Sequence, residues 1–449
     1  MGEVGEILGS AREGDLGFRR TSIFGVSTDS RTIKESELFV ALKGANHDGH
    51  DYLGAAFAGG AIAAIVSADE ARKRNLGGDK YFIVENTLYA LGELARNYRK
   101  KMGSRVVAVT GSNGKTTVKN LIYEIISRHG SALRSEANFN NLVGVPLSIF
   151  QLRDIHGAAV FELGMSARGE IARLAEISSP DVAVITNVGP VHLEFLKSVE
   201  EVAAAKLEVL GHIRKGGVLI VNGDDERLAR KLREISIQTI RFGIGAHNDV
   251  KPGGLELDGL QFSHFNINGE RVHLRLPGLH NVYNALAAWA VASAMDIEPS
   301  QAAAAINKFH TEGMRSEVVT LNDVTLVIDC YNANPVSTKS ALETLAGMEC
   351  RGRRMAVLGD MLELGEEGVS YHEEIGQLAR RLKIDVILGF GPLARHIIES
   401  FGDGGFHFGT KEGLINRLIQ TVNKGDVILF KGSRGMALEE VVDGLRKSL

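Results

Sequence analysis

Residues 109–117 read VTGSNGKTT, and this stretch decides which fold the chain can adopt. The apolar residues before it predict a buried strand that ends at Thr110, and the pattern after it predicts a helix that begins near Lys115. A glycine-rich turn between a strand and a helix lets backbone N–H groups converge on an anion, and the helix N-terminus adds about half a positive charge. Gly111 and Gly114 allow the unusual φ angles that such a turn needs. The stretch therefore predicts a phosphate-binding loop, in preference to a plain turn with a surface lysine.

The side chains of this loop suit a nucleotide. Lys115 can reach the β- and γ-phosphates, and the Thr116 hydroxyl can bind Mg²⁺. The spacing departs from the common G-x-x-x-x-G-K-[ST] pattern, because Val109 stands where that pattern has its first glycine. On its own, the loop leaves open a switch, a motor, a small-molecule kinase and an enzyme that makes a bond.

Strand-like and helical segments alternate on both sides of the loop. Apolar runs at residues 158–164, 181–188 and 216–225 are separated by helical patterns, so buried parallel strands with helices between them are the simplest interpretation. Residues 255–276 differ, because they alternate and turn at NGE, which predicts a β-hairpin.

The whole chain divides into three such units. Three short strand-like runs and a helix with a basic last turn form the first unit, and the alternation resumes after a hinge near residues 310–317. We predict domains at residues 1–102, 103–312 and 313–449. The expected fold class is α/β, with a P-loop mononucleotide-binding central domain whose sheet is mostly parallel and a Rossmann-like C-terminal domain.

Composition narrows the class of protein. The 449 residues are too many for one core, and a net charge of −4 argues against nucleic acid as the main ligand. Only Cys330 and Cys350 occur, which argues against a disulfide scaffold and fits a reducing cytosol. The acidic N-terminus does not resemble a signal peptide, and no apolar run is long enough to cross a bilayer. We therefore expect a cytoplasmic protein without membrane insertion.

Further motifs follow the loop in a fixed order. They are NFNNLVGVPL (138–147), FELGMSARGEI (161–171), ITNVGPVHLE (185–194), AAAKLE (203–208), GLHNVYNALAA (278–288), GMR (313–315), DCYNANP (329–335), GDMLELG (359–365) and KGSRGMALE (431–439), with STDSR (27–31) before the loop. Together they resemble the Mur ligases and their folylpolyglutamate synthetase relatives, over nearly the whole chain. DCYNANP and GDMLELG most resemble the branch of that family that adds D-alanyl-D-alanine to UDP-MurNAc-tripeptide.

The resemblance implies an ATP-dependent ligase that makes an amide bond through an acyl phosphate. It implies that the first domain binds the UDP group of the substrate and that the partners are small molecules, UDP-MurNAc-tripeptide and D-Ala-D-Ala. We expect a monomer. The alternative within the family is the ligase that adds the third residue of the stem peptide to the UDP-MurNAc-dipeptide.

The catalytic residues implied by the resemblance are few. From the residues alone, Glu162 ends a buried strand and suits Mg²⁺, whereas a lone His192 is usually structural and Lys206 looks like a lysine lying along an apolar helix face. The resemblance makes all three metal ligands together with Thr116, with Lys206 carbamylated and two Mg²⁺ ions bound. The catalytic set that it implies is Lys115, Glu162, His192, Lys206 and Arg315.

The same resemblance assigns the binding residues. Those expected to contact ATP are Gly111, Ser112, Asn113, Gly114, Lys115, Thr116, Thr117, Asn281, Asn284, Arg315 and Asp329. Those expected to contact the UDP-peptide substrate or line its cleft are Ser27, Asp29, Ser30, Arg31, Asn138, Asn140, Asn141, Asn332, Asn334, Asp360 and Lys431. Two positions depart from the family pattern, since Lys197 stands where glycine is usual and Thr338 where methionine is expected, and neither replaces a residue with a chemical role.

Other classes fit less well. A regulatory GTPase needs a guanine-reading N-K-x-D motif in the right place, and none appears. A small-molecule kinase needs no second α/β domain after the nucleotide domain, and a nucleotide-binding scaffold does not need so many polar residues at strand ends. Folylpolyglutamate synthetase lacks a separate UDP-binding domain before the phosphate loop.

Overall fold

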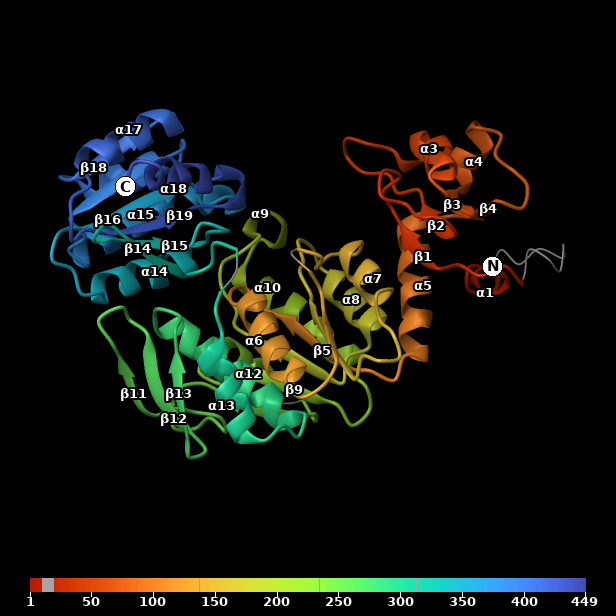
Figure 1. Cartoon of the computed structure of the whole chain (residues 1–449), viewed down its shortest axis with the longest axis horizontal. Coiled ribbons are helices and arrows are strands. Elements are labelled where there is room, and N and C mark those ends of the chain that lie inside the picture. Colours follow the sequence, from red (N-terminus) through yellow and green to blue (C-terminus); the bar gives the residue numbers. More distant parts are fainter. Residues whose placement is uncertain (10–19, 137, 234, 312) are drawn as a thin grey trace.

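The computed structural model describes residues 1–9, 20–136, 138–233, 235–311 and 313–449. Its described part forms three α/β domains, with the N-terminal and C-terminal domains at opposite ends and the central domain between them (Figure 1). The expected fold class is therefore confirmed. Within these ranges, no helix is both long enough and apolar enough to span a membrane.

The N-terminal domain is built on a parallel sheet in the order β1-β2-β3-β4. Its strands are β1 (Gly25–Ser27), β2 (Glu37–Val40), β3 (Ala63–Ser67) and β4 (Tyr81–Val84). Its short helices are α1 (Gly2–Ile7), η1 (Gly49–Tyr52), α3 (Leu53–Ala58) and α4 (Ala68–Lys73).

Helix α5 (Thr87–Lys101) joins this domain to the next one. Ala90, Leu91 and Leu94 pack under the N-terminal sheet, whereas Ala95 packs into the core of the central domain (Figure 1). The Tyr98 hydroxyl donates to the Leu152 carbonyl at 2.8 Å, and Arg99 Nε donates to the Ser178 carbonyl at 3.0 Å. Because α5 belongs to both packing units, it fixes the position of one domain on the other.

The central domain contains a six-stranded parallel sheet in the order β10-β9-β8-β5-β7-β6. Its strands are β5 (Arg105–Thr110), β6 (Ala132–Arg134), β7 (Ala158–Glu162), β8 (Val182–Ile185), β9 (Val218–Asn222) and β10 (Gln238–Phe242). From β5 the chain runs to β6 and β7 on one side and then crosses to β8 on the other. This reversal makes the carboxyl end of β5 the topological switch point, where open α/β sheets bind ligands.

Helices cover both faces of this sheet. Successive residues of β5 point to opposite faces, so Val107 and Val109 join one core and Val106 and Ala108 join the other. Helices on the first face are α6 (Lys115–Ser127), α12 (Leu279–Ala294) and α13 (Pro299–Lys308), and those on the second are α7 (Gly144–Ile149), α8 (Glu170–Ser178) and α10 (Val199–Leu207). The short segments α9 (Leu193–Leu196), η2 (Glu208–His212) and α11 (Glu226–Lys231) complete this domain.

A small antiparallel sheet, β11-β12-β13, projects from the central domain (Figure 1). The sequence predicts a hairpin here, and the structure confirms it as β12 (Ser263–Ile267) and β13 (Glu270–Leu274). Asn268 and Gly269 form its turn with φ of 50° and 86°, as a two-residue turn with left-handed residues requires. The structure adds a third strand, β11 (Gly253–Leu257), that the prediction did not contain.

The C-terminal domain carries a second six-stranded sheet, in the order β14-β15-β19-β16-β17-β18. Its strands are β14 (Glu317–Leu321), β15 (Val324–Ile328), β16 (Arg354–Gly359), β17 (Val386–Phe390), β18 (Gly405–Phe408) and β19 (Val427–Lys431). Only β14 runs antiparallel to its neighbour, so the sheet is mixed. Its helical segments are α14 (Pro335–Gly347), η3 (Gly365–Glu367), α15 (Gly368–Arg381), α16 (Ala394–Phe401), α17 (Lys411–Thr421), η4 (Arg434–Met436) and α18 (Glu439–Arg446).

Candidate active site

The phosphate loop lies between β5 and α6, at the switch point of the central sheet. Gly114 is the N-cap of α6 with φ of 80°, and Gly111 has φ of 149°. A Cβ at Gly114 would lie 2.3 Å from Asn284 Oδ1, and one at Gly111 would lie 1.8 Å from Thr186 Oγ1. Glycine is therefore required at both positions by backbone angle and by space.

Replacing Gly114 by alanine should weaken ATP binding at least tenfold. Alanine is strained at this φ by about 1 kcal/mol, and its methyl group would displace Asn284 from the loop. Isothermal titration with ADP and ATP measures the effect. Gly130→Ala is the matched control, because nothing lies within 4 Å of a Cβ built there. Equal affinity in Gly114→Ala and the control would contradict the assigned role of the loop.

The segment after β8 braces the loop from the neighbouring strand. Asn113 N donates to Asn187 Oδ1 at 2.9 Å, and Thr186 Oγ1 donates to the Asn113 carbonyl at 2.5 Å. Ser112 Oγ exchanges hydrogen bonds with the backbone of Gly189, at 2.9 and 3.2 Å. The loop is therefore held in its shape before any ligand binds.

Lys115 is folded across this loop. Its Nζ donates to the Gly111 carbonyl at 2.7 Å and to the Ser112 carbonyl at 3.4 Å. Desolvation in the crowded loop lowers the pKa of Lys115, and the charge of Arg315 lowers it further, whereas Glu162 opposes the shift. A bound phosphate would add the negative charge that favours the ammonium form of this side chain.

A buried carboxylate faces the first turn of α6. Glu162, at the end of β7, is 3% exposed, and its Oε2 accepts from Thr116 Oγ1 at 2.8 Å. Its Oε1 accepts from Asn140 Nδ2 at 3.0 Å, and Lys119 Nζ lies 3.9 Å from Oε2. Thr116 and Glu162 thus present hydroxyl and carboxylate oxygens together, the ligand type that Mg²⁺ prefers.

Lys119 is a residue that sequence reasoning missed. It is 2% exposed and donates from Nζ to the Ser135 carbonyl at 2.8 Å. It follows Thr116 by three residues on α6, so the two side chains share one helix face. The three-residue spacing could have predicted this position, because a lysine on the same helix face as the Thr116 hydroxyl lies near the Glu162 carboxylate.

Lys206 is buried in the last turn of α10. Its side chain is 2% exposed, and no described residue accepts a hydrogen bond from its Nζ or forms an ion pair with it. Burial, and then the charge of Lys115, hold the pKa of Lys206 well below its ordinary range. The amine therefore loses its proton more readily than that of an exposed lysine, and the deprotonated amine is the nucleophilic form.

His192 points to the C-terminal domain. It has φ of 54°, and its Nδ1 lies 2.6 Å from Glu363 Oε2. This hydrogen bond is the main reason that the pKa of Glu363 is lowered. The structure thus brings His192 to Glu363, and Glu162 to Thr116, as two separate pairs.

Two residues of the C-terminal domain, Arg315 and Asp329, are expected to contact the nucleotide. Arg315 lies over the ring of Tyr331 at 3.8 Å, and its charge acts on Lys115 across the interface. Asp329 Oδ2 accepts from Lys431 Nζ at 2.7 Å, and Asp329 Oδ1 accepts from Ser316 N at 3.1 Å. Asp329 and Lys431 therefore neutralise each other in this arrangement.

The amides of α12 lie behind the phosphate loop. Asn284 Nδ2 donates to Asn281 Oδ1 at 2.9 Å, and Asn281 Nδ2 donates to the Pro277 carbonyl at 2.9 Å. His280 Nδ1 beside them is buried and has no hydrogen-bond partner among the described residues. This chain of amides positions Asn284 against Gly114.

A cavity of about 740 Å³ separates the N-terminal and central domains. Four of the expected substrate residues line it, namely Ser27, Asp29, Asn138 and Asn141. Ser30 and Arg31 do not line it, and Arg31 instead forms an ion pair with Asp29 at 2.6 Å. Hydrogen bonds from the side chain and backbone of Arg31, and then its charge, lower the pKa of Asp29 to about 2.

The cavity also contains residues that sequence reasoning missed. Lys34, Gln151 and Arg153 line it, and so does Phe24, whose side chain is 76% exposed. An exposed aromatic ring and two cations suit a uracil base and a diphosphate. The remaining loop amide, Asn140, binds Glu162 instead of facing this cavity.

The expected substrate residues of the C-terminal domain lie in different places. Asn332 Oδ1 accepts from Ala333 N at 2.9 Å. Asp360 is 2% exposed and accepts from Ala394 N at 2.7 Å, so it braces its own domain here. Lys431 is also 2% exposed. Asp360 and Lys431 were expected at the cleft between the central and C-terminal domains, and both are buried here.

Asn334 connects the domains directly. Its Nδ2 donates to Asn113 Oδ1 at 2.6 Å, and its Oδ1 accepts from Asn113 Nδ2 at 3.3 Å. The same oxygen accepts from Ser337 N and caps α14 with Pro335 in the first turn. One amide thus starts a helix and holds the phosphate loop.

Asn334→Ala should lower the free energy of unfolding by about 1 kcal/mol, because the helix cap is lost. Asn334→Asp keeps the capping oxygen but cannot donate to Asn113, so it should keep most of that stability while weakening ATP binding. Urea denaturation and nucleotide titration of both variants separate the two roles. Equal stability of the two variants would show that the cap contributes nothing.

The site defines a class of enzyme. A preformed phosphate loop, a buried carboxylate beside its threonine and cationic residues from a second domain suit phosphoryl transfer from a nucleotide, in which charge neutralisation is the main requirement. Similarity to known proteins identifies the class further. The models "Mur ligase family, catalytic domain", "Mur ligase middle domain" and "Mur ligase, glutamate ligase domain" match residues 22–99, 109–292 and 314–434.

The chain belongs to the Mur ligase family. It is 38% identical over 439 residues to the UDP-N-acetylmuramoyl-tripeptide–D-alanyl-D-alanine ligase of Bacillus subtilis, covering 96% of this chain and 95% of that one. The ligase of the same name from Escherichia coli is 36% identical, with 97% and 96% covered.

Solved structures agree with this placement. MurF from Acinetobacter baumannii is similar with a TM-score of 0.89 and 30% identity, covering 99% of this chain and 98% of that one. MurF from Thermotoga maritima, solved with ADP, has a TM-score of 0.86 at 29% identity, with 94% and 97% covered. A ligase that adds 2,6-diaminopimelate has a TM-score of only 0.56 at 17% identity, with 99% and 98% covered, which shows the shared fold alone.

Proposed function

We propose that this chain joins D-alanyl-D-alanine to UDP-MurNAc-tripeptide with the hydrolysis of ATP, giving the UDP-MurNAc-pentapeptide of peptidoglycan synthesis. The observation that carries this function is full-length similarity to relatives that bear the name of this activity, at up to 38% identity. The alternative, addition of the third amino acid, is supported only by the shared fold at 17% identity.

The two substrates occupy two different places in the proposal. The cavity lined by Ser27, Asp29, Asn138 and Asn141 takes the UDP-sugar end, and the peptide runs from there towards the phosphate loop. ATP lies on that loop, with backbone N–H groups at the start of α6 directed to its phosphates. Asn281 and Asn284 lie behind the loop on the side assigned to the base.

The first chemical step forms an acyl phosphate. An oxygen of the tripeptide carboxylate bonds to the γ-phosphorus, and the bond from that phosphorus to ADP breaks. This step brings several negative charges together, so its barrier falls where cations are already in place. Lys115 and Arg315 fill that role, because they approach the same loop from two domains.

The second step forms the amide. The free amine of D-alanyl-D-alanine attacks the acyl carbon, and the tetrahedral intermediate releases inorganic phosphate while the amine gives up a proton. Water would compete with the amine for the acyl phosphate. The contacts Asn113–Asn334 and His192–Glu363 lie where the two domains meet, so domain closure would exclude water from the acyl phosphate.

The metal ligands in this proposal are Thr116, Glu162, His192 and a carbamylated Lys206. Thr116 and Glu162 fit Mg²⁺ because their oxygens lie 2.8 Å apart at the loop. Lys206 fits carbamylation because its amine is buried and its pKa is lowered, and addition of CO2 to the deprotonated nitrogen, with loss of a proton, gives a carbamate that carries a negative charge. Two Mg²⁺ ions, when bound, would neutralise the phosphate oxygens.

The test is an assay of phosphate release. Purified protein is incubated with ATP, Mg²⁺ and UDP-MurNAc-tripeptide, with or without D-alanyl-D-alanine, and the product is identified by mass spectrometry. Release that depends on the dipeptide, and a product of pentapeptide mass, are expected. Release only with a single diamino acid and UDP-MurNAc-dipeptide would favour the alternative, and release with neither pair would refute both. Gel filtration with light scattering tests the proposed monomer.

A further inference from the structure

A cluster of three potential metal ligands lies on the small antiparallel sheet, outside the site described above. Asp258 follows β11, His264 lies in β12 and His273 lies directly opposite it in β13. The two imidazole rings are stacked with centroids 4.2 Å apart, and His264 Nε2 lies 3.6 Å from Asp258 Oδ2. One ligand atom from each residue lies within 4.8 Å of the other two.

Two details set this cluster apart from an ordinary surface group. His273 Nε2 is buried and has no hydrogen-bond partner among the described residues, which is costly for a polar atom. Asp258 Oδ1 accepts from Leu260 N and from Phe262 N, both at 2.9 Å, so the carboxylate is oriented with Oδ2 left to face His264. Metal-binding carboxylates are commonly oriented by such hydrogen bonds.

We propose that Asp258, His264 and His273 bind one Zn²⁺ ion, with water as the fourth ligand. Two imidazoles and one carboxylate suit zinc, whereas Mg²⁺ prefers oxygen ligands. Donor atoms around tetrahedral zinc lie roughly 3.4 Å apart, so the pair His264 Nε2–Asp258 Oδ2, at 3.6 Å, is already close to the distance that zinc needs. The side chains of His264 and Asp258 are 35% and 38% exposed, which leaves room for entry of the ion.

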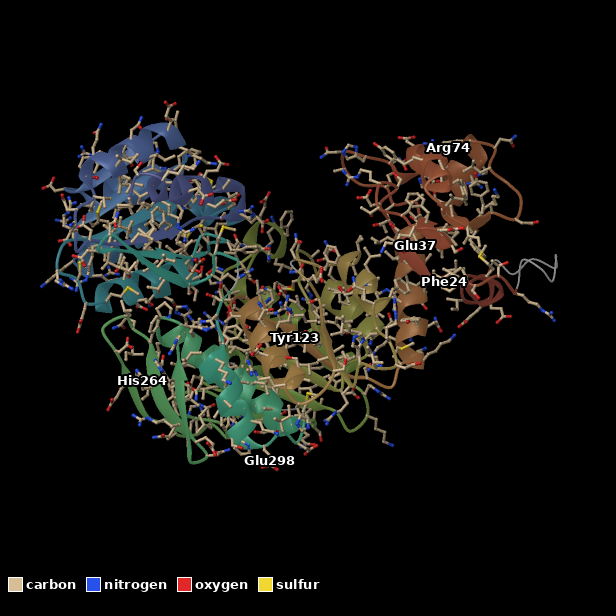
Figure 2. The ribbon with its side chains drawn as sticks, viewed as in Figure 1. Phe24, Glu37, Arg74, Tyr123, His264 and Glu298 are labelled. Atoms are coloured by element: carbon tan, nitrogen blue, oxygen red, sulfur yellow. The ribbon has the colours of Figure 1, made fainter. Side chains whose placement is uncertain are left out.

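The site lies beside a contact between domains. The loop that Asp258 orients carries the Gly259 carbonyl, which accepts from Glu349 N at 2.7 Å. It also carries Gln261, whose Nε2 donates to the Gly347 carbonyl at 2.7 Å. Figure 2 places His264 on the small sheet below the C-terminal domain, away from the phosphate loop. Bound zinc would hold this loop in the position that meets the C-terminal domain.

Isothermal titration of the full-length protein with ZnCl2 tests the site. Saturating ADP and MgCl2 are kept present, so that the nucleotide site is occupied. One Zn²⁺ per chain is expected in the wild type, with affinity more than about tenfold lower in His273→Ala and in His264→Ala. His129→Ala is the matched control, because His129 is an exposed histidine outside the cluster, and it should bind as the wild type does.

Equal zinc affinity in the wild type, His264→Ala and His273→Ala would overturn the proposal. If His273→Ala fails to fold by circular dichroism, His264→Ala, whose side chain is 35% exposed, decides in its place. A crystal grown with ZnCl2 and measured at the zinc absorption edge gives an independent answer. An anomalous peak among the three side chains supports the site, and peaks only elsewhere refute it.

Discussion

Replacing Glu162 by glutamine is expected to lower the rate of dipeptide-dependent phosphate release by roughly 100- to 1000-fold. Glutamine keeps the shape of the side chain and leaves an oxygen that can still accept from Thr116 or Asn140. It removes the negative charge that faces Thr116, so the proposed Mg²⁺ site loses its carboxylate ligand. It also leaves the charge of Lys119 without its nearest carboxylate, 3.9 Å away.

The measurement is steady-state kinetics over a range of Mg²⁺ concentrations. Glu124→Gln is the control, because Glu124 lies in α6 but pairs with Arg128 at the surface, and it should keep the wild-type rate. The Glu162→Gln rate should rise with added Mg²⁺ if a metal ligand was lost. A rate within threefold of wild type would remove Glu162 from the proposed metal site.

Lys206→Ala is expected to lower the rate of dipeptide-dependent phosphate release by a factor similar to that for Glu162→Gln, and to leave the protein folded. The side chain is buried and has no partner among the described residues. Its removal therefore breaks no ion pair and should not lower the free energy of unfolding for that reason. Its loss removes the proposed carbamate, and short carboxylic acids such as formate or acetate should restore part of the rate by occupying the vacated space.

Lys231→Ala, an exposed lysine of α11, is the control and should retain full activity without any effect of formate. Lys206→Arg adds a second test, because a guanidinium is not carbamylated and should remain inactive. Mass spectrometry of the wild type under CO2 should show an added mass of one carbamate. Full activity in Lys206→Ala would eliminate this role, and inactivity without rescue would leave the lysine as a required amine and refute the carbamate.

Local patterns in the sequence were enough to predict the α/β architecture. Apolar runs marked β5, β7, β8 and β9 because parallel strands are buried on both faces, and glycine spacing marked the phosphate loop. Glu162 could be placed at the carboxyl edge of the sheet, where the phosphate loop also lies, because it ends a buried strand. These predictions depend on short stretches of chain or on a rule that relates neighbouring strands.

Contacts between domains could not be obtained in this way. Asn113 and Asn334 are 221 residues apart, and nothing in either segment indicates that their amides pair. His192 was assigned to metal by resemblance, and its hydrogen bond to Glu363 depends on how the C-terminal domain docks. Lys34 and Arg153 reached one cavity from two domains for the same reason. The relative placement of folded units leaves little trace in local residue patterns.

Helix α5 has a consequence for which substrates the enzyme can accept. It is packed into both the N-terminal and the central domain, so it sets the span between the phosphate loop and the cavity that we propose for UDP. A stem peptide shorter by one residue would leave its carboxylate about 3.5 Å short of the γ-phosphate. If UDP and ATP bind as proposed, the helix would act as a spacer, and the scaffold as well as the side chains that touch the substrate would select for peptide length.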